Sequence, residues 1–101
     1  MSLWITFFIL PFDWLMKQYR DHKLLKGIAI VAKQLREDKG LSQEDVMNEI
    51  KIQSNINIHI GRIETAVGNM TISNLSVLCN YYNISLSKFF SKVEKEVLSL
   101  K

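Results

Sequence analysis

The sequence predicts an all-α domain of five short helices, and three observations support this fold class. Apolar residues recur every three or four positions along the chain after residue 23, which is the spacing of a buried helix face. A serine or threonine precedes three of these stretches, and glycine or asparagine follows several, as is typical of helix starts and stops. Strand-like alternation longer than a few residues does not occur beyond the amino terminus. At 101 residues and 48% apolar content, the chain fits one domain with short arms.

The first two helices are separated by a glycine. The first is expected over residues 24–39 and should end at Gly40. Its predicted buried face comprises Ile28, Val31, Ala32 and Leu35. The second should begin at Ser42, because a hydroxyl followed three residues later by the carboxylate of Asp45 forms a capping box. Its predicted buried face comprises Val46, Met47 and Ile50.

A turn and a short third helix come next. Residues 51–57 are polar and contain two asparagines, so they are predicted to form the turn. The third helix is expected over residues 58–65 and should end by Gly68. Ile60 and Ile63 share one face at i, i+3 spacing. The other faces then carry His59, Gly61 and Arg62.

Two further helices complete the predicted domain. Thr71 should cap the fourth helix and Asn83 should break it. Its inward residues are predicted to be Ile72, Leu75, Leu78, Cys79 and Tyr82. Ser85 should cap the fifth helix. Its apolar face is predicted to comprise Leu86, Phe89, Phe90, Val93, Val97 and Leu98.

The amino-terminal segment is strongly apolar, and five of the ten aromatic residues lie within its first sixteen positions. It is too short for a membrane-spanning helix and lacks the basic start and cleavage site of a secretory signal. Three interpretations remain open. The segment forms a strand or arm that pairs with a partner protein, it anchors the chain at a membrane surface with Lys17, Arg20 and Lys23 behind it, or it is not part of the natural protein.

Composition and charge exclude several classes of protein. One cysteine, Cys79, excludes a disulfide framework, and with His22 and His59 it cannot supply four zinc ligands. No metal and no cofactor is therefore expected. The net charge of +3 permits an anionic partner without requiring one. Residues 40–71 carry a net charge of −2, so the middle of the chain is slightly acidic.

Residues 34–90 resemble the helix-turn-helix family of lambda repressor and Cro, often called the XRE type. The resemblance rests on an ordered set of anchors, namely Leu35-Arg36, Gly40-Leu41-Ser42-Gln43-Glu44, Ile60-Gly61-Arg62-Ile63-Glu64, Asn69, Leu75, Ile84-Ser85-Leu86 and Phe89-Phe90. It implies a five-helix domain whose third helix enters the major groove of DNA. The expected organisation is an apolar arm over residues 1–23, a helix-turn-helix domain over 24–90 and a helical extension over 91–101.

The resemblance, with the chemistry of the side chains, implies a set of site residues. Arg36 should form a structural ion pair with Glu64. Arg62 and His59 could contact guanine or a phosphate, and Ile58 could meet a thymine methyl group. The expected DNA-binding residues are Gln43, Lys51, Ser54, Asn55, Asn57, Ile58, His59, Arg62 and Asn69. Gln43 could instead bind a neighbouring side chain, and at least one of the two asparagines in the turn should cap a helix. Cys79 and Thr71 are interpreted as a core residue and a cap.

The sequence departs from the family at the turn. Gln43 and Glu64 are 21 positions apart, about three more than is usual, so either the second helix gains a turn or the loop is longer. Met47 replaces a small residue and Lys51 replaces a glycine. Ala66 replaces another glycine, which predicts a different loop. Because the middle segment is acidic, attraction to DNA is expected to come from Lys33, Arg36 and Lys39.

The sequence therefore predicts a cytoplasmic, sequence-specific regulator of transcription that binds double-stranded DNA as a homodimer. The candidate dimer surfaces are the last helix and the aromatic arm, and the arm could also bind a protein partner. The alternative is a protein-interaction module of the same fold, such as an antitoxin or anti-repressor, with weak DNA binding. An enzyme is not expected, because the sequence contains no catalytic triad ordering, phosphate loop or paired carboxylates.

Overall fold

The computed structural model describes residues 20–100, so most of the expected amino-terminal arm lies outside the described part of the chain. Within that range the structure contains five helices and no strands. They are α3 (His22–Asp38), α4 (Gln43–Ser54), α5 (Ile60–Glu64), α6 (Ile72–Tyr81) and α7 (Leu86–Ser99). The predicted all-α fold class is confirmed. No helix within residues 20–100 has the length and apolar character needed to cross a membrane.

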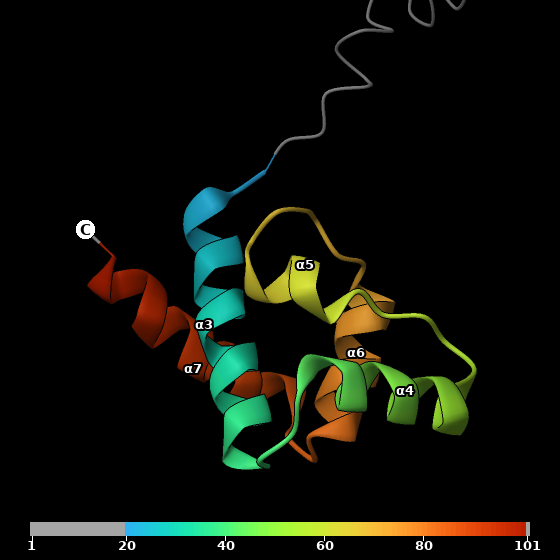
Figure 1. The fold of residues 1–101 in the computed structure, drawn as a ribbon. Helices are drawn as coiled ribbons and strands as arrows, with labels where there is room; N and C mark the ends of the chain where they lie inside the picture. The colour runs from blue at the N-terminus through green and yellow to red at the C-terminus, as the bar shows by residue number, and fades with distance from the viewer. Residues whose placement is uncertain (1–19, 101) are drawn as a thin grey trace, which may run out of the picture.

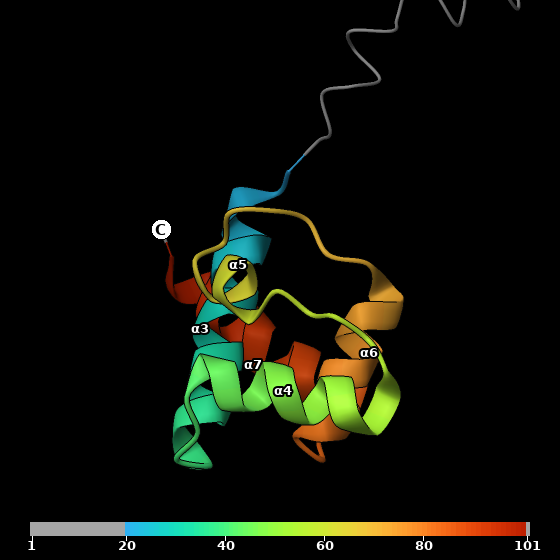
Figure 2. The same cartoon turned by 45° about the vertical axis from the view of Figure 1, so that its right-hand side comes forward.

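Helix α3 is the centre of the arrangement. It packs against α7 and against α5. Helix α4 lies below α5 in both views and contacts it (Figures 1 and 2). Gly27 lets α3 and α7 approach closely, because a Cβ atom at this position would lie 2.8 Å from Cγ2 of Val97. Because α5 contacts both α3 and α4, this short helix is supported by other helices.

The predicted caps fix the helix starts. Ser42, Thr71 and Ser85 each accept a hydrogen bond from a backbone amide three residues later, over 3.0 to 3.1 Å. The capping box is complete, since Asp45 Oδ2 also accepts from the Ser42 amide at 3.1 Å. Asp21 caps α3, which begins two residues earlier than expected. Gly40 follows α3 with a φ of 69°, the left-handed conformation that favours glycine.

The core consists of two clusters of buried apolar side chains. One comprises Ala32, Val46, Ile50, Ile58, Ile60, Leu78 and Tyr82. The other comprises Ile28, Val31, Leu75, Cys79, Phe89 and Val93. Leu35, Ile63 and Ile84 pack against both. The cores of the four longer predicted helices are thus confirmed in the main, and Cys79 is a buried core residue as expected.

Several residues that were expected to be buried face solvent. Met47 is 36% exposed and Ile72 is 80% exposed, so both predictions are wrong. On α4 only Val46 and Ile50 are buried. Ile72 is the first residue of α6, and the buried residues of that helix begin at Leu75. On α7 the apolar face is wider than the core requires. Phe89 and Val93 are buried, whereas Leu86, Phe90 and Leu98 remain exposed.

Candidate nucleic-acid interface

An ion pair joins α3 to α5. Arg36 Nε lies 2.7 Å from Glu64 Oε2, and Arg36 Nη2 donates to Glu64 Oε1 at 2.9 Å. The Arg36 side chain is 12% exposed and the Glu64 side chain 2% exposed. The hydrogen bond to Glu64 raises the pKa of the Arg36 guanidinium, so this group stays charged. The expected structural pair is therefore present, and its bidentate geometry fixes the orientation of α5.

Two further groups complete this clamp. Arg36 Nη1 donates to the carbonyl oxygen of Leu41 at 2.8 Å, and the Gln43 amide donates to Glu64 Oε1 at 3.1 Å. Gln43 is half-buried and was expected to contact DNA. In the structure its amide ties α4 to α5, so the interpretation as a bond to a neighbouring side chain is confirmed and the contact with DNA stays a prediction. Gly61 makes this close approach possible, because a Cβ atom there would lie 3.2 Å from Gln43 Oε1. We call Arg36, Gln43 and Glu64 the clamp.

The turn between α4 and α5 differs from the expectation. Residues 51–54, predicted as part of the turn, continue α4 by another turn of helix. Asn55 then ends the helix with a φ of 56°, and its amide donates to the Lys51 carbonyl at 2.9 Å. Asparagine tolerates this left-handed conformation better than most residues. Of the two open interpretations of Asn55, the structure shows the helix-ending one.

Residues 56–59 connect Asn55 to α5, and burial alternates from Ile56 through Ile60. Ile56 is half-buried, Ile58 is 3% exposed and Ile60 is buried, whereas Asn57 and His59 are exposed. Alternation is the rule in extended backbone, where successive side chains point to opposite sides. The expectation that Ile58 meets a thymine methyl group is therefore wrong. It assumed that residue 58 was already helical, but α5 begins at Ile60.

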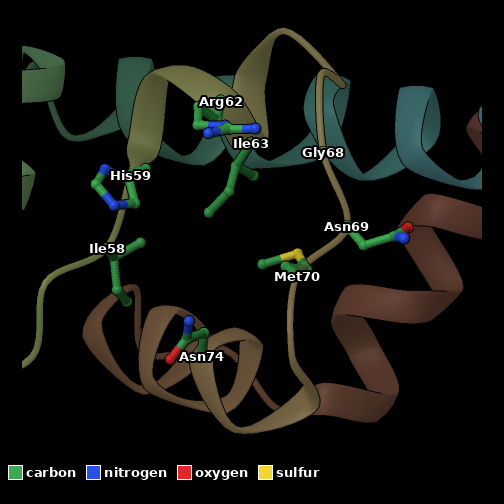
Figure 3. Close-up of a pocket in the computed structure, with 8 residues that line it drawn as sticks. All are labelled: Ile58, His59, Arg62, Ile63, Gly68, Asn69, Met70 and Asn74. Atoms are coloured by element: carbon green, nitrogen blue, oxygen red, sulfur yellow. The ribbon is translucent and has the colours of Figure 1, made fainter. Parts of the chain in front are cut away.

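The exposed side of α5 carries Arg62, with His59 just before the helix. A pocket of about 290 Å³ opens between them and α6, and its lining comprises Ile58, His59, Arg62, Ile63, Gly68, Asn69, Met70 and Asn74. Figure 3 shows Asn74 pointing into this pocket and Asn69 pointing away from it. Arg62 lies over Gly68, since a Cβ atom there would be 3.3 Å from Arg62 Nη2. Ile60 and Ile63 face the body, as predicted.

A groove of about 260 Å³ lies on the other side of His59. It is lined by Met47, Asn48, Lys51, Asn57, Ile58 and His59, and we call it the α4 groove. Lys51, Ser54 and Asn57 are exposed, as contacts with DNA require. Met47 and Asn48 were not predicted as site residues, because the sequence pattern assigned Met47 to the core and gave no signal for Asn48.

Lys39 and Arg36, which were expected to attract DNA, both make contacts within the protein. Lys39, expected to attract DNA, donates to the Tyr81 carbonyl at 3.3 Å and lies 4.8 Å from the centre of the Tyr81 ring. Arg36 is neutralised by Glu64 within the clamp. Ala66 has a φ of 57°, so the loop after α5 keeps the left-handed conformation that a glycine would take. The prediction that this loop differs from the loop of the family stays a prediction.

Helix α4 is followed by a short connection and by the short helix α5, which the ion pair between Arg36 and Glu64 ties to α3. This arrangement is a helix-turn-helix of the lambda-repressor class. The chain is similar to the restriction-modification controller protein C.Esp1396I, whose crystal structure holds the tetramer in complex with its natural 35 base-pair operator. The identity is 33% and the TM-score 0.60, over 74% of this chain and 95% of that chain. The chain belongs to the XRE-type helix-turn-helix family. No family model and no curated protein matches it.

Proposed function

We propose that this protein is a transcriptional regulator that binds double-stranded DNA in a sequence-specific manner through α5 and the connection before it. The observation that carries the proposal is the exposure of Arg62 on α5 and of Asn57 and His59 in the connection before it, while the clamp ties α5 to α3 and α4. Arg62 has no ion-pair partner among residues 20–100. An arginine in this situation can donate to guanine in the major groove.

The similarity to the controller protein supports the same proposal, because that protein was solved in complex with its operator. We extend it to a controller role in a restriction-modification system. Lys51, Ser54 and Asn69 are proposed to contact the DNA backbone, which sets the register of the protein without reading bases. One N–H of the Gln43 amide donates to Glu64, so only its second N–H and its oxygen remain for a contact with DNA.

A salt titration tests this function. Binding to duplex DNA should weaken steeply as salt rises, because each lysine or arginine that contacts a phosphate releases counterions. Lys51→Ala should reduce the slope by about one unit for one lost contact. The matched control is Lys92→Ala, which removes an exposed lysine of α7 and should leave the slope unchanged. Absence of salt-dependent binding by the wild-type protein would reject the proposal.

We also propose that the protein acts as a homodimer through α3 and α7. A groove of about 270 Å³ there is lined by Asp21, Leu24, Phe90, Val93, Glu94 and Val97. Leu24 and Phe90 are 38% and 40% exposed, so pairing with a second copy would remove apolar surface from water. Phe90→Glu should convert the dimer to a monomer in light scattering. Ile52→Glu, at an apolar residue of α4 that is 83% exposed, is the control.

The second candidate function is a protein-interaction module. It is favoured by the acidic middle of the chain and by exposed apolar residues such as Leu98 and Ile52. This function requires that the dimer forms while duplex DNA does not bind at low salt. The titration therefore separates the two functions.

A further inference from the structure

The α4 groove places three residues of α4, the first helix of the helix-turn-helix, beside the proposed DNA-reading side chains. Met47, Asn48 and Lys51 come from α4, and Asn57 and His59 come from the connection. Met47 and Lys51 are four positions apart and Asn48 and Lys51 three, so the three side chains lie on neighbouring rows of one helical surface. Lys51, which was predicted to lie in the turn, is helical in the structure and so shares this surface with Met47 and Asn48.

Helix α5 by itself offers little for base recognition. It has five residues, of which Ile60 and Ile63 face the core and Glu64 belongs to the clamp. Gly61 has no side chain. Arg62 is thus the one residue of this helix that can reach a base edge. Since each mismatched base pair typically changes the free energy of binding by about 1 to 3 kcal/mol, a specific site needs several readers, and other elements must supply them.

We propose that Asn48 and Met47 read one A·T base pair in the major groove, an inference that rests on the proposed function. Asn48 is exposed, and its amide makes no hydrogen bond within residues 20–100. An asparagine amide pairs with N6 and N7 of adenine through two hydrogen bonds. Met47 is 36% exposed and presents an apolar, deformable side chain that suits the methyl group of thymine. Lys51 neutralises a phosphate beside them.

Base analogues test this inference directly. An operator is first selected from a random duplex pool with the wild-type protein. Each adenine is then replaced in turn by 7-deazaadenine, which lacks the N7 acceptor, and each thymine by uracil, which lacks the methyl group. One adenine should show a loss of affinity of about 5-fold to 150-fold with the wild-type protein. The thymine that pairs with this adenine should show a loss of about 4-fold.

The variants identify the residues that read these groups. Asn48→Ala should bind the normal operator as weakly as the wild-type protein binds the 7-deazaadenine operator, and the two changes should not add. Met47→Ala should show the same relation with the uracil operator. Asn80→Ala removes an exposed asparagine of α6 outside the α4 groove and should change neither affinity. Both test residues are exposed, so circular dichroism melting should show that the variants remain folded.

Three results would overturn the inference. If Asn48→Ala weakens binding to the normal operator and to every 7-deazaadenine operator by the same factor, Asn48 does not read a base. If it changes no affinity, Asn48 does not contact DNA. In both cases the wild-type protein still selects an operator and the proposed function stands. If the wild-type protein selects no operator, the proposed function and this inference fail together.

Discussion

Two arginines of this protein show how the surroundings decide what one side chain does. Arg36 lies in the clamp, is 12% exposed and donates to both carboxylate oxygens of Glu64 and to a backbone carbonyl. Arg62 is exposed on α5 and has no ion pair within the described residues. A largely buried guanidinium that is bonded through all three of its nitrogens fixes the geometry of the body, whereas an exposed one keeps its donors for another molecule. The predictions below test this division.

The largest effect is expected at the clamp. Glu64→Ala should lower the free energy of unfolding by about 3 to 5 kcal/mol, because it leaves the buried charge of Arg36 without its partner. Urea denaturation measures the change. Lys92→Ala, which removes an exposed charge on α7 outside the proposed dimer groove, should change it by less than about 0.5 kcal/mol. Equal stability of the two variants would show that the clamp does not stabilise the fold.

The second prediction compares neighbours in the connection before α5. Ile58→Ala should destabilise the fold by about 2 to 5 kcal/mol, because Ile58 is a core residue. His59→Ala should leave stability within about 0.5 kcal/mol and weaken DNA binding instead. Urea denaturation and fluorescence anisotropy with labelled operator separate the effects. If Ile58→Ala weakens DNA binding and His59→Ala destabilises the fold, Ile58 belongs to the surface that contacts DNA and His59 to the core.

Arg62→Ala should act on binding rather than on folding. If Arg62 donates to a guanine, its loss should reduce discrimination at one base pair by about 1 to 3 kcal/mol. Stability should change by less than about 0.5 kcal/mol. Competition between the selected operator and single-base variants measures discrimination. A variant that loses affinity uniformly for all sequences would place Arg62 on a phosphate.

A smaller effect is expected at Tyr81. Its hydroxyl donates to Glu49 Oε1 at 2.7 Å, and burial together with this bond raises the pKa of Tyr81 to about 12. The unfolded chain loses this proton near pH 10, so the stability that the protonated phenol contributes is complete below pH 10. It is lost as the pH rises toward 12.

Tyr81→Phe tests this pH window. The variant should be less stable than the wild-type protein by about 1 kcal/mol at pH 7, through the lost hydrogen bond. The difference should shrink between pH 10 and pH 12, because the variant has no proton to lose at this position. Urea denaturation at pH 7 and pH 11.5 measures it. A difference that is the same at both pH values would contradict the assignment.

The smallest effect is expected at the loop after α5. Ala66→Gly should raise the free energy of unfolding by about 0.5 to 1 kcal/mol, because the positive φ strains a residue with a Cβ atom. Ala32→Gly, inside α3, should lower it. Thermal melting of both variants checks the signs. A destabilised Ala66→Gly variant would show that the left-handed conformation carries no strain.

The helices and their caps could be predicted from the sequence because their causes are local. Ser42, Thr71 and Ser85 bond to amides three residues away, and no distant contact is needed to place them. The ion pair between Arg36 and Glu64 was implied by the family resemblance and not by any local pattern, since 28 positions separate the two residues. The α4 groove was missed because a helical pattern alone made Met47 a core residue.

The sequence by itself determined the five helices within residues 20–100, the caps at Ser42, Thr71 and Ser85, and most of the residues that form the core. The tertiary structure decided which apolar residues stay outside the core, such as Met47 and Ile72, and how the turn is built around Asn55. It also turned Gln43 from a free first-turn side chain into part of the clamp. Local hydrogen bonds and periodicity act within a few residues of one another, whereas burial depends on which helix packs on which, and only the complete fold sets that arrangement.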